Sequence, residues 1–191
     1  MKTSKILASL LIMATVLFVS CKKDPLTPPN ETELITTLKL TFTDTAAPYT
    51  SYTAVFRDID GDGGIDATLD SLRIPAGKVY AASLLLLDER DASAVDTTNN
   101  EIEEERAAHQ FFYQSIPSDV ITNFTYLTFD DNGKPLGTEF GCNTKSAPAT
   151  GTLRITLRHQ PDKDAAGVSG GDISNANGET DIEVEFPVRL Y

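Results

Sequence analysis

The chain has little of the cysteine and histidine that serve in many catalytic centres, metal sites and covalent cross-links. Its 191 residues include two cysteines, two histidines and no tryptophan. It has no phosphate-binding P-loop, no His-Glu-x-x-His metalloprotease motif and no Cys-x-x-Cys pair. These absences favour a protein that binds over one that catalyses, and we expect no enzyme activity.

Basic residues are scarce as well. The chain has 16 Lys and Arg against 28 Asp and Glu, a formal net charge of -12. Non-specific binding to nucleic acid needs a surplus of positive charge, so this class of partner is excluded. Hydrophobic residues still make up 40% of the chain. That is too many for a disordered protein and enough for one folded domain.

The N-terminus predicts export and a lipid anchor. Lys2 and Lys5 precede an uncharged apolar run over Ile6–Val19, which is too short to cross a bilayer and is typical of a signal peptide. The sequence of Leu17–Cys21 resembles the lipobox of bacterial lipoproteins, with Phe18 where Leu is usual. An ordinary cleaved signal peptide, with an incidental cysteine, is the alternative.

The lipobox resemblance implies that Cys21 carries the acyl chains that hold the protein on a membrane, and more than one chain makes such anchoring stable. We therefore divide the chain into a lipoprotein signal peptide (1–20), a lipidated cysteine with a flexible tether (21–33) and a folded domain (34–191). With Cys21 lipidated, Cys142 has no partner for a disulfide within the chain.

Alternation of apolar and polar residues with period two dominates the rest of the chain and predicts strands. The predicted strands cover Thr36–Phe42, Tyr52–Phe56, Lys78–Leu87, Gln110–Gln114, Phe124–Phe129, Leu153–Arg158 and Ile182–Leu190. The last two are the clearest, and Lys78–Leu87 alternates less. One segment, Asn100–Ala108, is predicted to be helical, with Thr98 and Glu101 placed for a capping box. We expect an all-β fold: a two-sheet antiparallel β-sandwich of about eight or nine strands with one short helix, or alternatively a closed barrel.

Three positions give finer predictions about this fold. Leu84–Leu87 is apolar on both sides, as in a central strand covered on both faces. Pro187 cannot donate a hydrogen bond, so the last strand should lie at a sheet edge or carry a bulge there. Asp131–Gly133 has the residues of a tight turn and predicts a hairpin.

An acidic, glycine-rich segment is the first candidate site. Asp58, Asp60 and Asp62 have the spacing of the first ligands in an EF-hand calcium loop, where oxygen atoms surround a hard cation. The twelfth position of that loop is Leu69 instead of Glu, and strands instead of helices flank the segment. We predict calcium bound in a β-hairpin loop by Asp58, Asp60, Asp62 and Asp66. A solvated acidic turn is the alternative.

The two histidines are the second candidate site. His159 continues the inward face of the strand Leu153–Arg158, and His109 follows a run of glutamates. If their strands pair, the two imidazoles could meet and bind a transition metal or ligate a haem, with Glu104 or Glu105 nearby. The alternative is that each histidine has an ordinary structural role at a strand end.

A third candidate is the segment Gln160–Thr180, which is rich in glycine, aspartate and asparagine. A loop of this length is unusual in a compact domain, and long loops are often functional. It could grip a ligand or bind a second cation, and flexible surface is the alternative.

The start of the mature chain also resembles outer-membrane lipoproteins of Bacteroidota. The junction Val19–Pro25, with Phe56–Gly64, Glu103–Tyr113 and Leu153–Asp172, is similar to an uncharacterised lipoprotein group of that phylum, sometimes labelled type 1 periplasmic-binding-fold proteins. That fold alternates strands with long helices, whereas the pattern here predicts one short helix. The resemblance implies an outer-membrane address, where such lipoproteins often work beside TonB-dependent receptors in nutrient uptake.

Together these predictions describe a lipid-anchored binding module of the cell envelope. We expect it to capture a small ligand or a metal, or to dock on an outer-membrane uptake receptor. Calcium in the Asp58–Asp66 loop would have a structural role. The alternative is a structural or adhesive surface lipoprotein that has no small ligand.

Overall fold

The structure is a computed structural model of the chain, and it describes residues 33–61, 63–91, 95 and 97–191. The predicted signal peptide and lipidation site, Cys21, lie outside the described residues. The described residues all belong to one compact unit. No helix in the described ranges is long and apolar enough to span a membrane.

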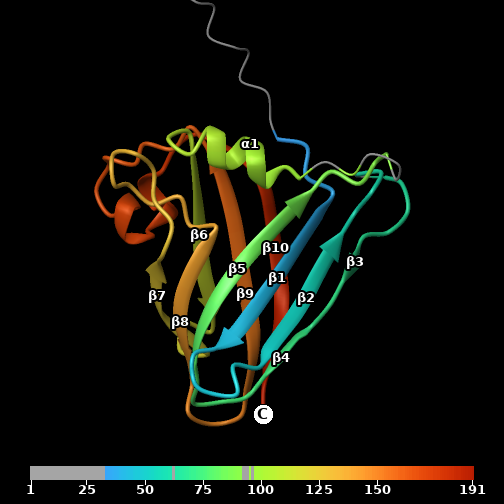
Figure 1. The fold of residues 1–191 in the computed structure, drawn as a ribbon, viewed down its shortest axis with the longest axis vertical. Helices are drawn as coiled ribbons and strands as arrows, with labels where there is room; N and C mark the ends of the chain where they lie inside the picture. Colours follow the sequence, from blue (N-terminus) through green and yellow to red (C-terminus); the bar gives the residue numbers. More distant parts are fainter. Residues whose placement is uncertain (1–32, 62, 92–94, 96) are drawn as a thin grey trace, which may run out of the picture. The chain divides into compact units, whose positions relative to one another are not determined.

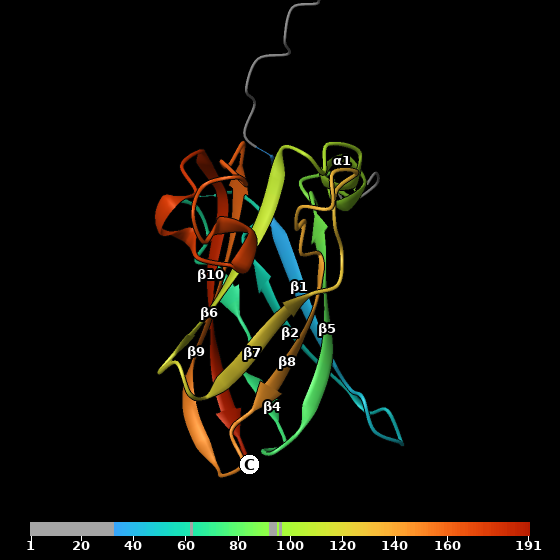
Figure 2. The same cartoon turned by 90° about the vertical axis from the view of Figure 1, so that its left-hand side faces the viewer.

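The described residues form two β-sheets, which confirms the predicted all-β sandwich (Figure 1, Figure 2). The strands of the first sheet are β1 (Thr37–Asp44), β2 (Ser51–Arg57), β3 (Thr68–Leu69), β5 (Val79–Leu87), β7 (Ile121–Tyr126) and β8 (Glu139–Thr144), in the order β3-β2-β1-β5-β8-β7. Those of the second are β4 (Leu72–Ile74), β6 (His109–Ile116), β9 (Ala149–His159) and β10 (Glu179–Leu190), in the order β4-β10-β9-β6. All neighbouring strands pair antiparallel except β4 and β10.

The core lies between the two sheets. Every second residue of β1, Leu38, Leu40 and Phe42, is fully buried, as the alternation predicts. The ring of Phe42 packs against Tyr80 and Phe140, with ring centroids 5.5 and 5.8 Å apart. Burying one such side chain contributes about 1.5–3 kcal/mol, so this layer supplies the main stabilisation of the fold.

One end of the sandwich gathers several chain segments that are far apart in the sequence. The helix α1 (Asn99–Glu104) lies there, beside the chain that enters β1 (Figure 1). β6 begins at this end, and β9 ends there in register with it. The loop that joins β9 to β10, residues 160–178, lies at the same end over the second sheet (Figure 2). The C-terminus lies at the opposite end (Figure 1).

One of the finer strand predictions is wrong, and another holds only locally. β5 is central, between β1 and β8, but its two faces differ: Leu84 and Leu86 are buried, whereas Leu85 is 37% exposed. β10 has neighbours on both sides only over Val188–Leu190, where β4 pairs with it, so Pro187 lies on the stretch that pairs with β9 alone. Pairing with β4 begins only at Val188, and the ladder on that side therefore needs no donor from the proline. The bulge in β10 lies elsewhere, between Thr180 and Ile182.

The helix is shorter than predicted, and its capping box does not form. Thr98 is the N-cap residue, but its side chain makes no capping hydrogen bond. Its hydroxyl instead donates to the carbonyl of Leu34 at 3.3 Å. The predicted turn at Asp131–Gly133 is present, with Gly133 at a φ of 73° and a bridge between Phe129 and Pro135 across it.

Candidate metal centre

The second sheet places the two histidines opposite each other. β6 and β9 pair antiparallel, and His109 is in direct register with His159. Their ring centroids are 4.6 Å apart. Both side chains lie on the core-facing side, in line with Phe111 and Leu157, and both are buried. The meeting of the two imidazoles that the sequence offered as one alternative is therefore present in the structure.

Two carboxylates complete the cluster. Asp181 lies at the bulge of β10, with its side chain fully buried, and Glu33 lies on the chain that enters β1. His109 Nε2 is 3.5 Å from Glu33 Oε1 and 3.6 Å from Asp181 Oδ2. His159 Nδ1 is 3.7 Å from Asp181 Oδ1. Glu33, His109 and His159 each offer a ligand atom within 4.8 Å of the others.

These donor atoms are buried without hydrogen-bond partners. Four side-chain N or O atoms in the described part of the chain are both buried and unpartnered, and three belong to this cluster: His109 Nε2, His159 Nδ1 and Asp181 Oδ2. Leaving one such group unpaired costs about 1–3 kcal/mol. Three in one place require an explanation, and a shared cation supplies one.

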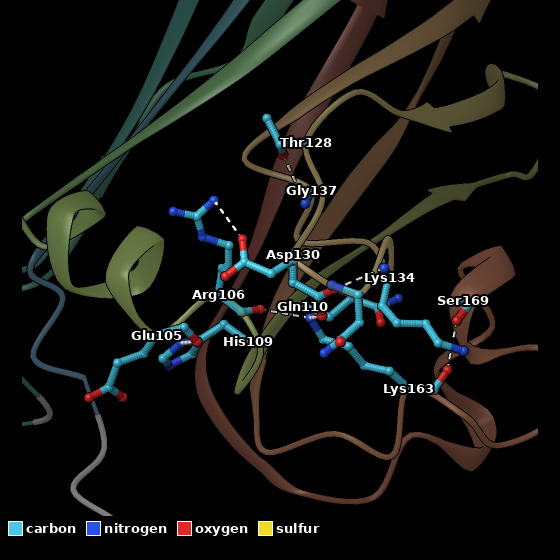
Figure 3. Close-up of polar contacts among 12 residues, drawn as sticks. Glu105, Arg106, His109, Gln110, Thr128, Asp130, Lys134, Gly137, Lys163 and Ser169 are labelled. Atoms are coloured by element: carbon cyan, nitrogen blue, oxygen red, sulfur yellow. Dashed lines mark hydrogen bonds and ion pairs between the residues drawn. The ribbon is translucent and has the colours of Figure 1, made fainter.

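His109 is oriented as a metal ligand requires. Its Nδ1 is 3.1 Å from the backbone carbonyl oxygen of Glu105 (Figure 3). Because a carbonyl only accepts hydrogen bonds, this contact places the proton on Nδ1 and leaves the Nε2 lone pair directed at the cluster. Burial, and then the nearby His159, lower the pKa of His109 to about 4. The ring is therefore neutral at pH 7, the form that binds metals.

The carboxylates lie in an environment that disfavours negative charge. Burial, followed by the nearby Glu101, Asp181 and Glu105, raises the pKa of Glu33 to about 7. Burial also raises the pKa of Asp181, although His159 opposes the shift. A bound divalent cation would neutralise these charges and remove the repulsion between them.

The spacing of the donors fits a small, four-coordinate ion. Zinc bonds to His nitrogen and carboxylate oxygen are about 2.0–2.2 Å long, so neighbouring ligands of a tetrahedral site are separated by about 3.3–3.6 Å. The observed separations of 3.5, 3.6 and 3.7 Å lie at the upper end of that range or just above it. They are too long for normal hydrogen bonds, which are about 2.7–3.2 Å. The cluster therefore has the dimensions of a metal site more than those of a hydrogen-bond network.

The sequence indicated the histidines but not the carboxylates beside them. Glu105 contributes its backbone carbonyl instead of its side chain, and Glu104 is exposed on α1. Asp181 follows the outward-facing pattern of its strand, and nothing local signals the bulge that buries it. Glu33 was assigned to the tether, whereas its backbone N–H donates to Asp181 Oδ1 at 3.4 Å.

The predicted calcium loop shows no comparable convergence among its described residues. Asp62 lies outside them. Asp58 accepts a hydrogen bond from the N–H of Gly61 at 3.0 Å, and Asp60 accepts one from Ile65 at 2.9 Å. Those carboxylates stabilise the turn itself, and calcium binding here stays a prediction of the sequence.

The loop between β9 and β10 is ordered. It contains two short 3-10 helices, η1 (Val168–Gly170) and η2 (Ile173–Asn175). The buried ammonium of Lys163 donates to the backbone carbonyl of Arg106 at 2.7 Å and to Asp130 Oδ2 at 3.1 Å (Figure 3). This ion pair fixes the loop to the turn that follows β7, beside the histidine cluster.

The same loop contains a motif that was missed in the sequence. Residues 167–171, Gly-Val-Ser-Gly-Gly, match the Gly-x-Ser-x-Gly pattern of a hydrolase nucleophile elbow, in which the serine lies between a strand and a helix. Here Ser169 lies in η1, and its hydroxyl donates to the backbone carbonyl of Lys163 at 2.6 Å. The serine therefore has a structural role in the loop.

A small cavity lies where this loop meets the edge of the first sheet. Its volume is about 260 Å³, and Tyr126 and Gly171 are among its lining residues. The hydroxyl of Tyr126 already donates to the carbonyl of Phe111 at 2.7 Å. None of the lining residues, Tyr113, Phe124, Thr125, Tyr126, Gly170 and Gly171, is charged or a usual metal ligand, so the cavity has less ligand-binding chemistry than the histidine cluster.

Cys142 is not part of either site. It lies on β8 and is 2% exposed. Burial raises the pKa of its thiol to about 12. The thiolate, which is the reactive and metal-binding form, is therefore not populated at neutral pH.

Comparison with known proteins gives no further assignment. No protein-family model matches the chain, and no curated protein or solved structure matches it. The functional argument accordingly rests on the chemistry of the histidine cluster.

Proposed function

We propose that this protein is a lipid-anchored binding module of the cell envelope that holds one divalent transition metal ion. Zinc is the ion whose geometry and affinity are used to test the site. The observation that carries the proposal is the buried convergence of His109, His159, Asp181 and Glu33. Neighbouring donors there are 3.5–3.7 Å apart. Three of the atoms have no hydrogen-bond partner.

The donor set favours zinc over calcium and over haem. Two imidazole nitrogens suit zinc and related transition metals, whereas calcium takes oxygen ligands. Carboxylate oxygens from Glu33 and Asp181 lie within 3.6 Å of His109 Nε2, in the space that a porphyrin would need. Glu33, His109 and His159 offer ligand atoms within 4.8 Å of one another, and Asp181, which lies beside both histidines, is the candidate fourth ligand. A shell closed by four protein ligands is typical of a site that holds its ion, whereas a catalytic site keeps one position open.

Membrane anchoring through Cys21 and the outer-membrane address rest on the N-terminal sequence. In that setting, a domain that takes up a metal could pass it to an uptake receptor, and docking on such a receptor stays part of the proposal. A structural or adhesive lipoprotein is the second candidate. In that case the histidine cluster would bind no ion.

The experiment is a zinc titration against a competing chelator. It uses the chain from Lys22 onward, which contains the whole compact unit of residues 32–191. We expect one zinc ion per chain, and a loss of about 100-fold or more in affinity for His159→Ala. Removing a ligand should weaken binding at least as much as the largest losses caused by removing a residue that only supports a ligand. Asp66→Ala in the acidic loop is the control and should bind zinc like the wild type. Equal affinity in wild type and His159→Ala would overturn the proposal, as would the absence of zinc binding.

A further inference from the structure

Glu33 differs from the other three residues of the cluster in its place in the chain. His109, His159 and Asp181 come from β6, β9 and β10, which are neighbours in one sheet and fix one another through long ladders. Glu33 precedes β1 and belongs to neither sheet. It is also the most exposed of the four, with 11% of its side chain accessible against 0–6% for the others.

The chain from Glu33 to Ile35 is held to the domain by few contacts. Regular sheet hydrogen bonding begins with Thr36, whose N–H donates to the carbonyl of Leu87 at 2.9 Å. Before that point, the Glu33 N–H donates to Asp181 and the Leu34 carbonyl accepts from Thr98, in long bonds of 3.4 and 3.3 Å. The Glu33 side chain also shares a hydrogen bond with the side chain of Glu101. Ile35 adds partial packing against the core, while Leu34 is 56% exposed.

A bound cation would add a strong contact to this attachment. Glu33 Oε1 is 3.5 Å from His109 Nε2, so a divalent ion held by His109, His159 and Asp181 would lie within reach of the Glu33 carboxylate, which would then coordinate it. The segment is thus weakly held in the empty site and bound more firmly in the occupied one.

We propose that the segment 33–35 is a strap that closes over the site when the metal binds and opens when it leaves. This inference rests on the proposed metal binding and adds the segment that metal occupancy controls. It also assigns Glu33 as the ligand that releases first, since the other three are fixed in the sheet. Metal exchange therefore requires movement of the strap and leaves the sandwich unchanged.

The strap connects the site to the predicted membrane anchor. Eleven residues, 22–32, separate Cys21 from Glu33. Fully extended, they reach at most about 40 Å, and release of the three strap residues adds about 10 Å. Metal occupancy would thus set both the point at which the tether leaves the domain and how far the domain can lie from the membrane.

Amide hydrogen exchange tests the strap directly. Two samples of the chain from Lys22 onward are compared, one with saturating zinc and one with chelator. Exchange is followed in a peptide that covers residues 33–36. We expect zinc to slow exchange there by about tenfold or more, because local opening then requires the loss of a metal ligand. Glu33→Ala should still bind zinc, more weakly, but its strap should exchange at the metal-free rate. Glu104→Gln, an exposed glutamate on α1, is the matched control and should behave like the wild type.

The outcomes separate the strap from the metal site. If zinc binds the wild type but exchange at residues 33–36 does not change, the strap proposal is wrong and the metal-site proposal stands. If Glu33→Ala shows the same slowing as the wild type, the strap closes without Glu33 and the inference is overturned. If the wild type binds no zinc, both proposals fail together.

Discussion

His109 and His159 face each other directly across the β6–β9 ladder, with ring centroids 4.6 Å apart inside the sandwich. A shift of one residue in the register would move one of the two imidazoles to the opposite face of the sheet. The hydrophobic pattern that buries Phe111 and Leu157 on the same face therefore also fixes the histidine pair. In this way the fold brings together two residues that are 50 positions apart in the sequence.

Asp181→Asn should separate the stability of the protein from its metal affinity. The carboxylate is buried, with Oδ2 unpartnered, and burial raises its pKa. An amide removes the buried charge, so the metal-free variant should melt no lower than the wild type. Its zinc affinity should fall by at least about tenfold, because a neutral amide is the weaker ligand. Melting curves with zinc and with chelator measure both effects, and an unchanged zinc-induced shift would contradict the assignment of Asp181.

Gly178→Ala should disrupt the close packing of the chain at residue 178 against the backbone of His159. Gly178 has a φ of 69°, and an added Cβ would lie 2.2 Å from the carbonyl oxygen of His159. The matched control is Gly133→Ala, at a φ of 73° with no atom within 4 Å of the added carbon. Positive φ alone costs about 1–3 kcal/mol, and each kcal/mol lowers the melting temperature by about 2–4 °C in a domain of this size.

We therefore expect Gly178→Ala to lower the melting temperature clearly more than Gly133→Ala, and to weaken zinc binding as well. Equal effects of the two variants on stability would show that the close contact is relieved without cost.

Lys163→Met should destabilise the protein strongly. The variant leaves Asp130 buried without its cation, and breaking a buried pair by removing one partner costs about 3–5 kcal/mol. Lys134→Met is the control, since Lys134 pairs with Asp164 at the surface, where such pairs contribute about 0–1 kcal/mol. Urea unfolding gives both values. A loss for Lys163→Met no larger than that of the control would show that the pair does not hold the loop.

Asp130 should contribute to acid sensitivity. Burial alone would raise its pKa, but hydrogen bonds from the Lys134 N–H, the Lys163 ammonium and the Asn132 N–H lower it below 3.8. The unfolded chain therefore takes up this proton at a higher pH than the native protein, so acid favours unfolding. The stability that Asp130 provides over Asp130→Asn should be complete above about pH 4 and shrink as the pH falls further. Urea unfolding of both proteins from pH 7 to acid measures it, and a difference that grows in acid would have the wrong sign.

Strand positions could be predicted because alternation is a local signal. The burial of Leu38, Leu40 and Phe42 follows directly from it. β8 was missed because Gly141 and Asn143 interrupt the apolar pattern, and its place between β5 and β7 depends on pairing with both. Pairing partners are set by contacts far apart in sequence, which one sequence does not display.

The candidate site likewise contains residues that the sequence could predict and residues that it could not. His159 continues an inward-facing run, so its orientation could be predicted, and its meeting with His109 needed only that the two strands pair. Asp181 could not be predicted, because the bulge between Thr180 and Ile182 changes the direction of its side chain. Glu33 could not be predicted either, because it contacts Asp181 across 148 residues of sequence and lies in a segment whose composition is that of a tether.

X-ray absorption at the zinc edge of the loaded protein tests the metal site most directly. The account predicts four nitrogen or oxygen ligands at about 2.0–2.2 Å, two of them imidazoles whose outer ring atoms scatter characteristically. His159→Ala should lose one imidazole contribution, whereas Asp66→Ala should give the wild-type spectrum. A shell of five or six oxygens without imidazole would show that zinc binds carboxylates elsewhere and that the His109–His159 cluster is not its site.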